Sequence, residues 1–218
     1  MTISTMTLPA GDGDERRLNS LGLSTSILHT ALTPGLSRAN NRSAMALPSS
    51  GGTDIYHDTM EQLALTLADA GWRLIWVDRQ PRLLHPDALL AFTLASGTNV
   101  ASADRRKQPR TRRKGQATRN SLAGPYAEVL PLFEEEQMEQ DSALVAAASA
   151  APLWFLVHER TERGLNLEFS RPAEMTEAGA VVEWEERILV GFLDLDGDLS
   201  IFESPDDGNF DVPVSPRS

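Results

Sequence analysis

The chain has 218 residues, a formal net charge of −11 at pH 7 and no cysteine. The lack of cysteine excludes disulfides, thiolate nucleophiles, iron–sulfur clusters and cysteine-based zinc sites. The sequence shows neither a secretory signal pattern at its start nor an apolar run long enough to cross a membrane, so we expect a soluble cytoplasmic protein.

The first half of the chain predicts helices followed by short strands. Residues 1 to 14 are small and polar and predict a disordered terminus. Apolar residues recur at helical spacing from 15 to 32, and Pro34 and Gly35 predict the end of that helix. A second helix is predicted to start at Thr53 or Asp54 and to stop at Gly71. The segments WRLIWV, LLH and ALLAFTLAS then have the composition of strands, which completes a helix-plus-sheet unit from 15 to 97.

Residues 98 to 151 differ in composition from both neighbouring parts and predict a charged linker. The segment from Asp104 to Asn120, DRRKQPRTRRKGQATRN, carries eight of the 20 basic residues of the chain. Five acids follow between Glu134 and Asp141, and the alanine-rich stretch after them has the character of a linker or a weak helix.

The C-terminal part, from 152 to 203, predicts an antiparallel β meander. LNLEFS alternates apolar and polar residues, AVVEWEERILVGFLDL continues that pattern, and Asp196 with Gly197 between apolar runs indicates a hairpin. Residues 204 to 218 predict a disordered tail. The fold class is therefore α+β, a small helix-plus-antiparallel-sheet unit followed by an antiparallel meander, and whether the two sheets form one domain is left open.

The sequence lacks most of the known motifs for catalysis and for nucleotide or metal binding. The chain has no phosphate-binding loop, no dinucleotide-binding glycine pattern and no serine nucleophile elbow, and its four histidines lack metal-ligand spacing. The alternating Asp194, Asp196 and Asp198 resemble the start of a calcium loop, but Leu199 and Pro205 stand where that loop requires glycine and glutamate. Pro86 and Asp87 resemble part of a nuclease core, but no acid-x-lysine triplet follows them.

The remaining carboxylates favour structural interpretations. The glutamates around Trp184 are more typical of a solvated sheet face with an arginine on a neighbouring strand than of a catalytic pair. An enzyme remains an alternative if residues from distant segments form one pocket in the folded chain. The candidate residues of such a pocket are His85, Asp87, His158, Glu168 and Glu183. We predict no catalytic residue, no cofactor and no metal ligand.

The basic segment is the main functional candidate. We interpret it as a flexible arm of a non-enzymatic accessory protein that binds DNA or RNA without sequence preference, because no aromatic residue lies between Phe92 and Tyr126 to stack on bases. The predicted contact residues are Arg105, Arg106, Lys107, Arg110, Arg112, Arg113, Lys114 and Arg119. Two alternatives stay open: a solvated loop that pairs with the acids from Glu134 to Asp141, and an adaptor that recruits a protein through an edge of the C-terminal sheet.

An ordered set of short motifs runs from about 15 to 190. The motifs are Gly71 with Trp72, Pro86 with Asp87, KGQAT at 114–118, WFLVH at 154–158, EFSRP at 168–172 and WEERIL at 184–189. The set resembles a group of bacterial proteins of unassigned activity that is associated with mobile elements and defence islands. It departs from that group after Ala95, where SGTNVASA replaces a GDxxTG-like turn. The resemblance implies the layout above and DNA-related work, and it implies no catalytic residue.

Overall fold

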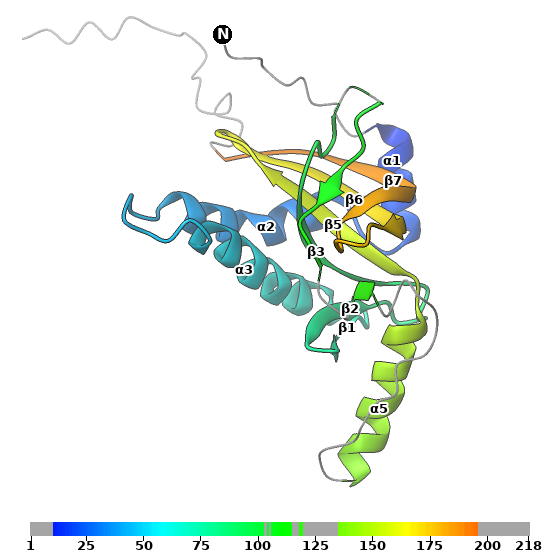
Figure 1. Cartoon of the computed structure of the whole chain (residues 1–218). Coiled ribbons are helices and arrows are strands. Elements are labelled where there is room, and N and C mark those ends of the chain that lie inside the picture. The colour runs from blue at the N-terminus through cyan, green and yellow to red at the C-terminus, as the bar shows by residue number, and fades with distance from the viewer. Residues whose placement is uncertain (1–10, 103, 105, 115–117, 120–134, 196–218) are drawn as a thin grey trace, which may run out of the picture.

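The computed structural model describes residues 11–102, 104, 106–114, 118–119 and 135–195, with the main chain alone at 135–141 (Figure 1). The tail predicted from 204 onward and the hairpin predicted at Asp196 and Gly197 lie outside these residues. The described elements are α1 (Asp12–Ser20), α2 (Thr25–Asn40), α3 (Ser50–Leu67), β1 (Arg73–Val77), β2 (Gln80–Leu84), β3 (Ala91–Thr98), β4 (Arg110–Thr111), α5 (Glu135–Ala150), β5 (Leu153–Arg160), β6 (Gly164–Met175) and β7 (Val181–Asp194).

The strands form one seven-stranded sheet, which confirms the α+β class. The order is β1-β2-β3-β5-β6-β7, with β4 paired to β3 beside this path. All pairs are antiparallel except β3 with β5, which run parallel from Ala91 opposite Leu153 to Ser96 opposite His158. The strands predicted on either side of the 98–151 segment therefore pair directly with each other.

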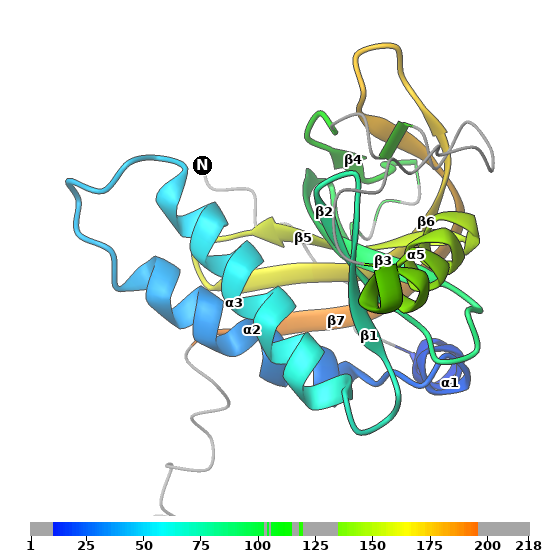
Figure 2. The same cartoon turned by 90° about the horizontal axis from the view of Figure 1, so that it is seen from below.

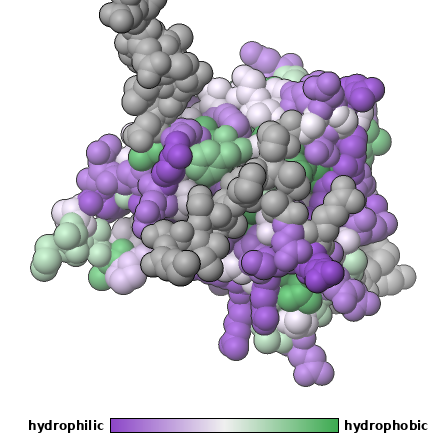
Figure 3. Space-filling view, turned by 90° about the horizontal axis from the view of Figure 1, so that it is seen from above, coloured by the Kyte–Doolittle hydropathy of each residue, from purple (hydrophilic) through white to green (hydrophobic). Residues whose placement is uncertain are grey.

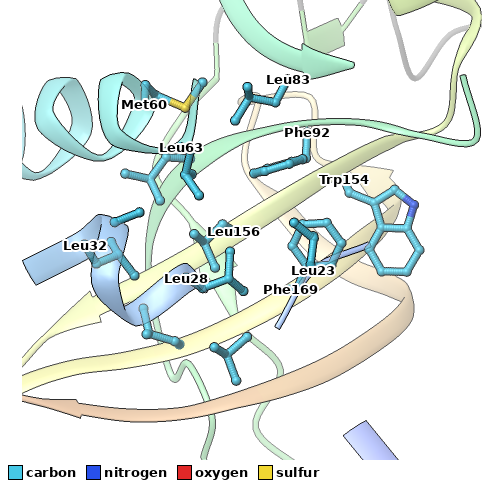
Figure 4. Close-up of a cluster of buried hydrophobic side chains, with 14 of the residues drawn as sticks. Leu23, Leu28, Leu32, Met60, Leu63, Leu83, Phe92, Trp154, Leu156 and Phe169 are labelled. Atoms are coloured by element: carbon cyan, nitrogen blue, oxygen red, sulfur yellow. The ribbon is translucent and has the colours of Figure 1, made fainter. Parts of the chain in front are cut away.

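The helices α1, α2 and α3 cover one face of this sheet, as Figure 1 and Figure 2 show from two sides. The main hydrophobic core lies between them and the strands. Ten of its side chains are labelled in Figure 4: Leu23, Leu28, Leu32, Met60, Leu63, Leu83, Phe92, Trp154, Leu156 and Phe169. The apolar residues that recur at helical spacing and those that alternate along the strands thus pack together in one buried layer.

The N-terminal helices differ from the prediction in three ways. Helix α1 begins at Asp12, inside the segment predicted to be disordered, because three acids favour the first turn of a helix and Leu18 is buried. The helix predicted from 15 to 32 is two helices, separated at Gly22, whose φ is +70°. Helix α2 continues through Pro34 to Asn40, since the burial of Leu36 and Ala39 against the core outweighs the hydrogen bond that the proline removes.

Helices α2 and α3 pack closely because Gly35 has no side chain. A Cβ atom at Gly35 would lie 2.8 Å from the Cα of Ile55 and 2.9 Å from the carbonyl oxygen of Asp54. Two ion pairs also join the helices and the start of their connection, Arg38 with Asp58 at 3.0 Å and Arg42 with Asp54 at 2.5 Å. The missing side chain at Gly35 therefore lets the backbones of α2 and α3 approach closely.

The opposite face of the sheet carries two smaller buried clusters. One contains Ala95, Val100, Leu153, Phe155, Val157 and Val181, and the other lies beneath the C-terminal end of α5. Arg82 is fully buried under that helix end: Nη1 donates to the carbonyl of Ala148 at 3.4 Å, and Nε and Nη2 donate to Oε1 of Gln80 at 3.1 and 2.9 Å. Burial lowers the pKa of Arg82 to about 10, so the guanidinium stays charged beside the negative end of the α5 dipole.

None of the helices in the described ranges is both long and apolar enough to cross a membrane. The face of the molecule seen from above is dominated by hydrophilic residues, with hydrophobic ones in separate small areas (Figure 3).

The close approach at Gly35 gives a first testable prediction. We expect Gly35→Ala to lower the free energy of unfolding by about 1–3 kcal/mol, because the added methyl group must push two backbones apart. Urea denaturation followed by circular dichroism measures the change. The matched control is Gly52→Ala, in α3, where a Cβ meets nothing within 4 Å and where alanine should be neutral or add up to about 1 kcal/mol. Equal losses in both variants would contradict the role assigned to Gly35.

Candidate functional site

The basic segment lies against the sheet, on the face that α1, α2 and α3 leave uncovered. We call its residues 104 and 106–114 the strap; residues 118 and 119 of the same segment are also described but are not part of it. Its main chain pairs with β3, where Thr111 lies opposite Gly97, and the N–H of Arg112 donates to the carbonyl of Ser96 at 3.1 Å. Figure 2 shows β4, the paired part of the strap, beside the connection between β6 and β7 and away from α2 and α3.

The hairpin formed by β6 and β7 holds the other side of the strap. Nε1 of Trp184 donates to the carbonyl of Pro109 at 2.7 Å, and the N–H of Val181 donates to Oγ1 of Thr111 at 3.0 Å. The N–H of Lys114 donates to the carbonyl of Gly179 at 2.7 Å. The sequence interpretation of this segment as a flexible arm is therefore corrected for 106–114, because its backbone groups and its buried Pro109 and Thr111 are bound on two sides.

A buried carboxylate organises the loop that leads into the strap. Glu168 is 0% exposed and accepts hydrogen bonds from the N–H of Ala101 at 2.5 Å, from Nε and Nη2 of Arg187 at 2.8 and 2.5 Å, and from Oγ of Ser170 at 3.3 Å. The same loop is held a second time where the N–H of Val100 donates to Glu159 at 2.9 Å. Glu168 is thus satisfied on both oxygens, and its described contacts give it a structural role.

All cationic side chains of the strap except that of Lys114 point to solvent. Those of Arg106, Lys107, Arg110, Arg112 and Arg113 are exposed, and none of them forms an ion pair with an acid among the described residues. Arg119 is also exposed, and its guanidinium lies over Gly179, where a Cβ would come within 2.8 Å of Nη2. Arg105 lies outside the described residues. The structure therefore groups most of the predicted contact residues on one supported segment.

Lys114 differs from the other cations of the basic segment. Its Nζ atom lies 5.3 Å from the centroid of the Phe155 ring, a cation–π contact. Burial lowers the pKa of Lys114 to about 8. Because this ammonium group is directed at the sheet, we remove Lys114 from the set of exposed contact residues.

His158, near the same end of the sheet, is a buried and neutral histidine. Neither Nδ1 nor Nε2 has a hydrogen-bond partner among the described residues. Burial, together with the nearby charges of Lys114 and Arg112, lowers its pKa to about 4. A histidine that stays neutral above about pH 4 and forms no hydrogen bond within the described residues is poorly suited to proton transfer near neutral pH.

The residues proposed for an assembled enzyme pocket lie in different places. His85 accepts from the N–H of Asp87 at 3.0 Å in one tight turn and packs on Trp72. Glu168 lies under the loop after β3, and Glu183 lies opposite Glu174 near the end of the β6–β7 ladder. His158 and Glu168 are diagonal neighbours on β5 and β6, but the strand alternation directs their side chains to opposite faces of the sheet. Among the described residues, only His85 and Asp87 of this set share a hydrogen bond, so the structure does not bring the five residues together in one pocket.

The other acidic candidates are held by arginines on neighbouring elements. Glu185 pairs with Arg171 at 3.1 Å, and Asp194 pairs with Arg163 at 2.9 Å. Within the described ranges, no group of three or more histidine, aspartate or glutamate residues is placed to hold a metal ion. The side chains from Glu134 to Asp141, predicted as an internal partner of the basic segment, lie outside the described residues.

A local signal for the strap was present in the sequence and was missed. In QPRTR, at 108–112, Pro109 and Thr111 are buried whereas Arg110 and Arg112 are exposed. This alternation is the period of a strand, although the high charge of the surrounding residues favours a linker. Trp184 donates to Pro109 of the strap, and Arg187 donates to Gln108 of the strap. Neither contact could be assigned from the sequence without the fold.

Comparison with known proteins finds no matching family model, no similar curated protein and no similar solved structure. The resemblance to a group of bacterial proteins therefore stays a prediction. In its KGQAT motif, residues 115–117 lie outside the described residues, and Thr118 is buried, with its Oγ1 accepting from Nε2 of Gln80 at 3.1 Å.

The buried carboxylate gives a second prediction. We expect Glu168→Gln to lower the free energy of unfolding by about 2–4 kcal/mol, because it leaves the charge of Arg187 uncompensated in a largely buried place. Chemical denaturation at neutral pH measures this loss. Glu185→Gln is the matched control, since it removes a glutamate from an exposed ion pair with Arg171 on the same two strands and should change stability by less than about 1 kcal/mol. Similar losses in the two variants would contradict the role of Glu168.

Lys114 gives a third prediction, on pH dependence. Its pKa is about 8 in the folded chain against an ordinary lysine pKa of 10.5, so the unfolded chain binds more protons between these values. Stability should therefore rise as the pH increases from about 8 to 10.5. Lys114→Met should remove this rise in the free energy of unfolding, measured by urea denaturation at a series of pH values. Lys107→Met, at the exposed lysine of the same segment, should retain it; a rise that persists in Lys114→Met would contradict the assignment.

Proposed function

We propose that this chain is a non-enzymatic nucleic-acid-binding protein that contacts phosphates through the cations of the strap. The observation that carries the proposal is the exposure of Arg106, Lys107, Arg110, Arg112 and Arg113 on one supported segment, with no acidic partner among the described residues. The net charge of the whole chain is −11, so this local positive charge is a departure from the rest of the sequence rather than part of a basic protein.

The strand alternation of β7 supports a positive local potential at the strap. Trp184 faces the strap and donates to Pro109. Glu183, the neighbour of Trp184 along the strand, is directed away from that face. Glu185 and Glu186 form ion pairs with Arg171 and Arg17, at 3.1 and 2.6 Å. The acids of this hairpin therefore neutralise the strap less than their closeness in the sequence indicates.

The chemistry of the strap favours backbone contacts over base reading. Four of the five exposed cations are arginines, whose planar guanidinium groups can bind phosphate oxygens with two hydrogen bonds. No aromatic residue lies between Phe92 and Tyr126, and the indole of Trp184 already donates to Pro109, so the strap lacks a stacking platform. Binding through these groups would be independent of sequence and strongly reduced by salt.

The way in which the strap is held changes the energetics of this binding. A flexible arm loses conformational freedom when it binds, whereas the strap backbone is already ordered by its contacts to β3, β6 and β7. Less ordering is required on binding, which leaves more of the electrostatic attraction as affinity. The proposal therefore replaces the flexible grip expected from the sequence with a supported cationic surface.

A charge-matched comparison tests the function as a fourth prediction. Arg110→Gln, Arg112→Gln and Arg113→Gln are combined in one variant, and Arg16→Gln, Arg73→Gln and Arg79→Gln, all at exposed positions, form the control. Fluorescence anisotropy with labelled duplex DNA and with single-stranded RNA measures affinity over a range of salt concentrations. For duplex DNA, the slope of log affinity against log salt should fall by about 0.9 for each lost phosphate contact in the strap variant.

The control variant makes the test specific, because it lowers the net charge by the same amount as the strap variant. It should bind nearly as well as the unchanged chain. If the two variants lose affinity equally, the strap is not the binding surface. If the unchanged chain binds neither DNA nor RNA at low salt, the proposed function is wrong and the cations serve another purpose.

A further inference from the structure

The strand β1 forms one edge of the sheet and has a neighbour on one side only. It pairs with β2 from Arg73 opposite Leu84 to Val77 opposite Gln80. Among the described residues, no hydrogen bond other than those to β2 reaches its main chain. The other edge, β7, is partly occupied, because Nη1 of Arg17 donates to the carbonyl of Arg187 at 2.9 Å.

The hairpin geometry defines which main-chain groups of β1 face outward. The turn has two residues, Asp78 and Arg79, both with positive φ (47° and 65°), as in a type I′ turn. Its closing pair, Val77 with Gln80, exchanges hydrogen bonds, and every second pair along the hairpin does the same. The N–H and carbonyl groups of Leu74 and Trp76 therefore point away from β2, toward the open edge.

Large apolar side chains accompany these open groups. Leu74 is 38% exposed and Trp76 is 60% exposed, and both lie on the same face of β1. Ile75 and Val77 lie on the other face, which α5 covers. An exposed edge strand with a tryptophan is a template for pairing with another strand.

We propose that β1 pairs with β1 of a second copy of this chain, antiparallel about a two-fold axis that passes through Ile75. In this register Leu74 lies opposite Trp76 of the second copy, and on the other side of the axis Trp76 lies opposite Leu74 of the second copy. Because both residues present outward N–H and carbonyl groups, each of these two pairs exchanges two hydrogen bonds. The two apolar side chains then pack against each other across the new pair.

Charge favours a second copy of the chain as the partner of β1. It also favours the register centred on Ile75 over one centred on Trp76. The two-fold places Arg73 beside the Val77–Asp78 end of the second copy, so that an exposed cation meets an exposed acid twice. A register with Trp76 opposite itself would instead place Arg73 opposite Arg79, which sets like charges against each other. The edge is thus complementary to itself in the register centred on Ile75, and this self-complementarity favours a second copy over an unrelated strand.

The proposed interface is small, so the association should depend on concentration. Two five-residue strands and four hydrogen bonds place it below the size of a permanent dimer interface. It uses neither the strap nor nucleic acid, and it stands or falls independently of the function proposed above.

A cysteine cross-link is the fifth prediction and tests the register. The chain has no cysteine, so Ile75→Cys can form a disulfide only between two copies. Residues opposite each other in a pair without hydrogen bonds have Cα atoms about 4.5 Å apart, which is within the range that disulfides span. Mild oxidation of nuclease-treated protein should therefore give a covalent dimer on a non-reducing gel. Met45→Cys is the control. Met45 is 92% exposed in the connection between α2 and α3, and this connection lies at the end of α3 that is distant from β1.

A second variant keeps the proposal falsifiable if Ile75→Cys folds poorly. Trp76→Lys adds a charge at an exposed position of the edge, a change that opposes strand pairing. In sedimentation velocity, the unchanged chain should shift from monomer to dimer as its concentration rises, and Trp76→Lys should stay monomeric. Cross-linking of Ile75→Cys no faster than that of Met45→Cys would overturn the proposal. So would an unchanged chain that is monomeric at every concentration, or a dimer that Trp76→Lys does not weaken.

Discussion

On the sheet face opposite to α1, α2 and α3, the arrangement of the chain depends on the burial of one carboxylate. Glu168 has no exposed surface, and a buried charge is tolerated only where hydrogen bonds and an opposite charge replace its water. Its partners come from separate segments: Ser170 on its own strand, Arg187 on β7 and Ala101 in the loop after β3. Arg187 also reaches Gln108, in the strap, at 3.5 Å. Satisfying Glu168 thus brings the end of β3, the hairpin and the beginning of the strap to one place.

The parallel pairing of β3 with β5 explains where the charged middle of the chain goes. Two parallel neighbours cannot be joined by a tight turn, so the chain must cross from one end of the sheet back to the other. In this chain the crossover contains both the strap and α5, and the described parts of these two segments lie on the face opposite to α1, α2 and α3. The return is anchored where Arg82 donates to the last turn of α5. The high charge of this segment therefore belongs to a crossover within one sheet rather than to a tether.

Local patterns predicted more of this fold than of its candidate site. The α+β class followed from strand alternation such as that of Leu165, Leu167 and Phe169, and the helical stripe of α3 was equally clear. The continuation of α2 through Pro34 was missed because tertiary burial outweighs a local propensity. The pairing of β3 with β5 was missed because no local signal specifies a contact between distant segments. For the site, composition found the cations but could not separate Lys114, which lies against Phe155, from the exposed Lys107.

The strap is attached through its backbone and through Pro109 and Thr111, while its outward positions make no described contact that the fold needs. This division frees the outward positions for natural variation. Substitutions at Arg106, Lys107, Arg110, Arg112 or Arg113 change the surface potential in small steps and leave the attachments unchanged. Over evolutionary time, attraction to polyanions can therefore be strengthened, weakened or reversed on the same scaffold, with selection on binding largely separate from selection on folding.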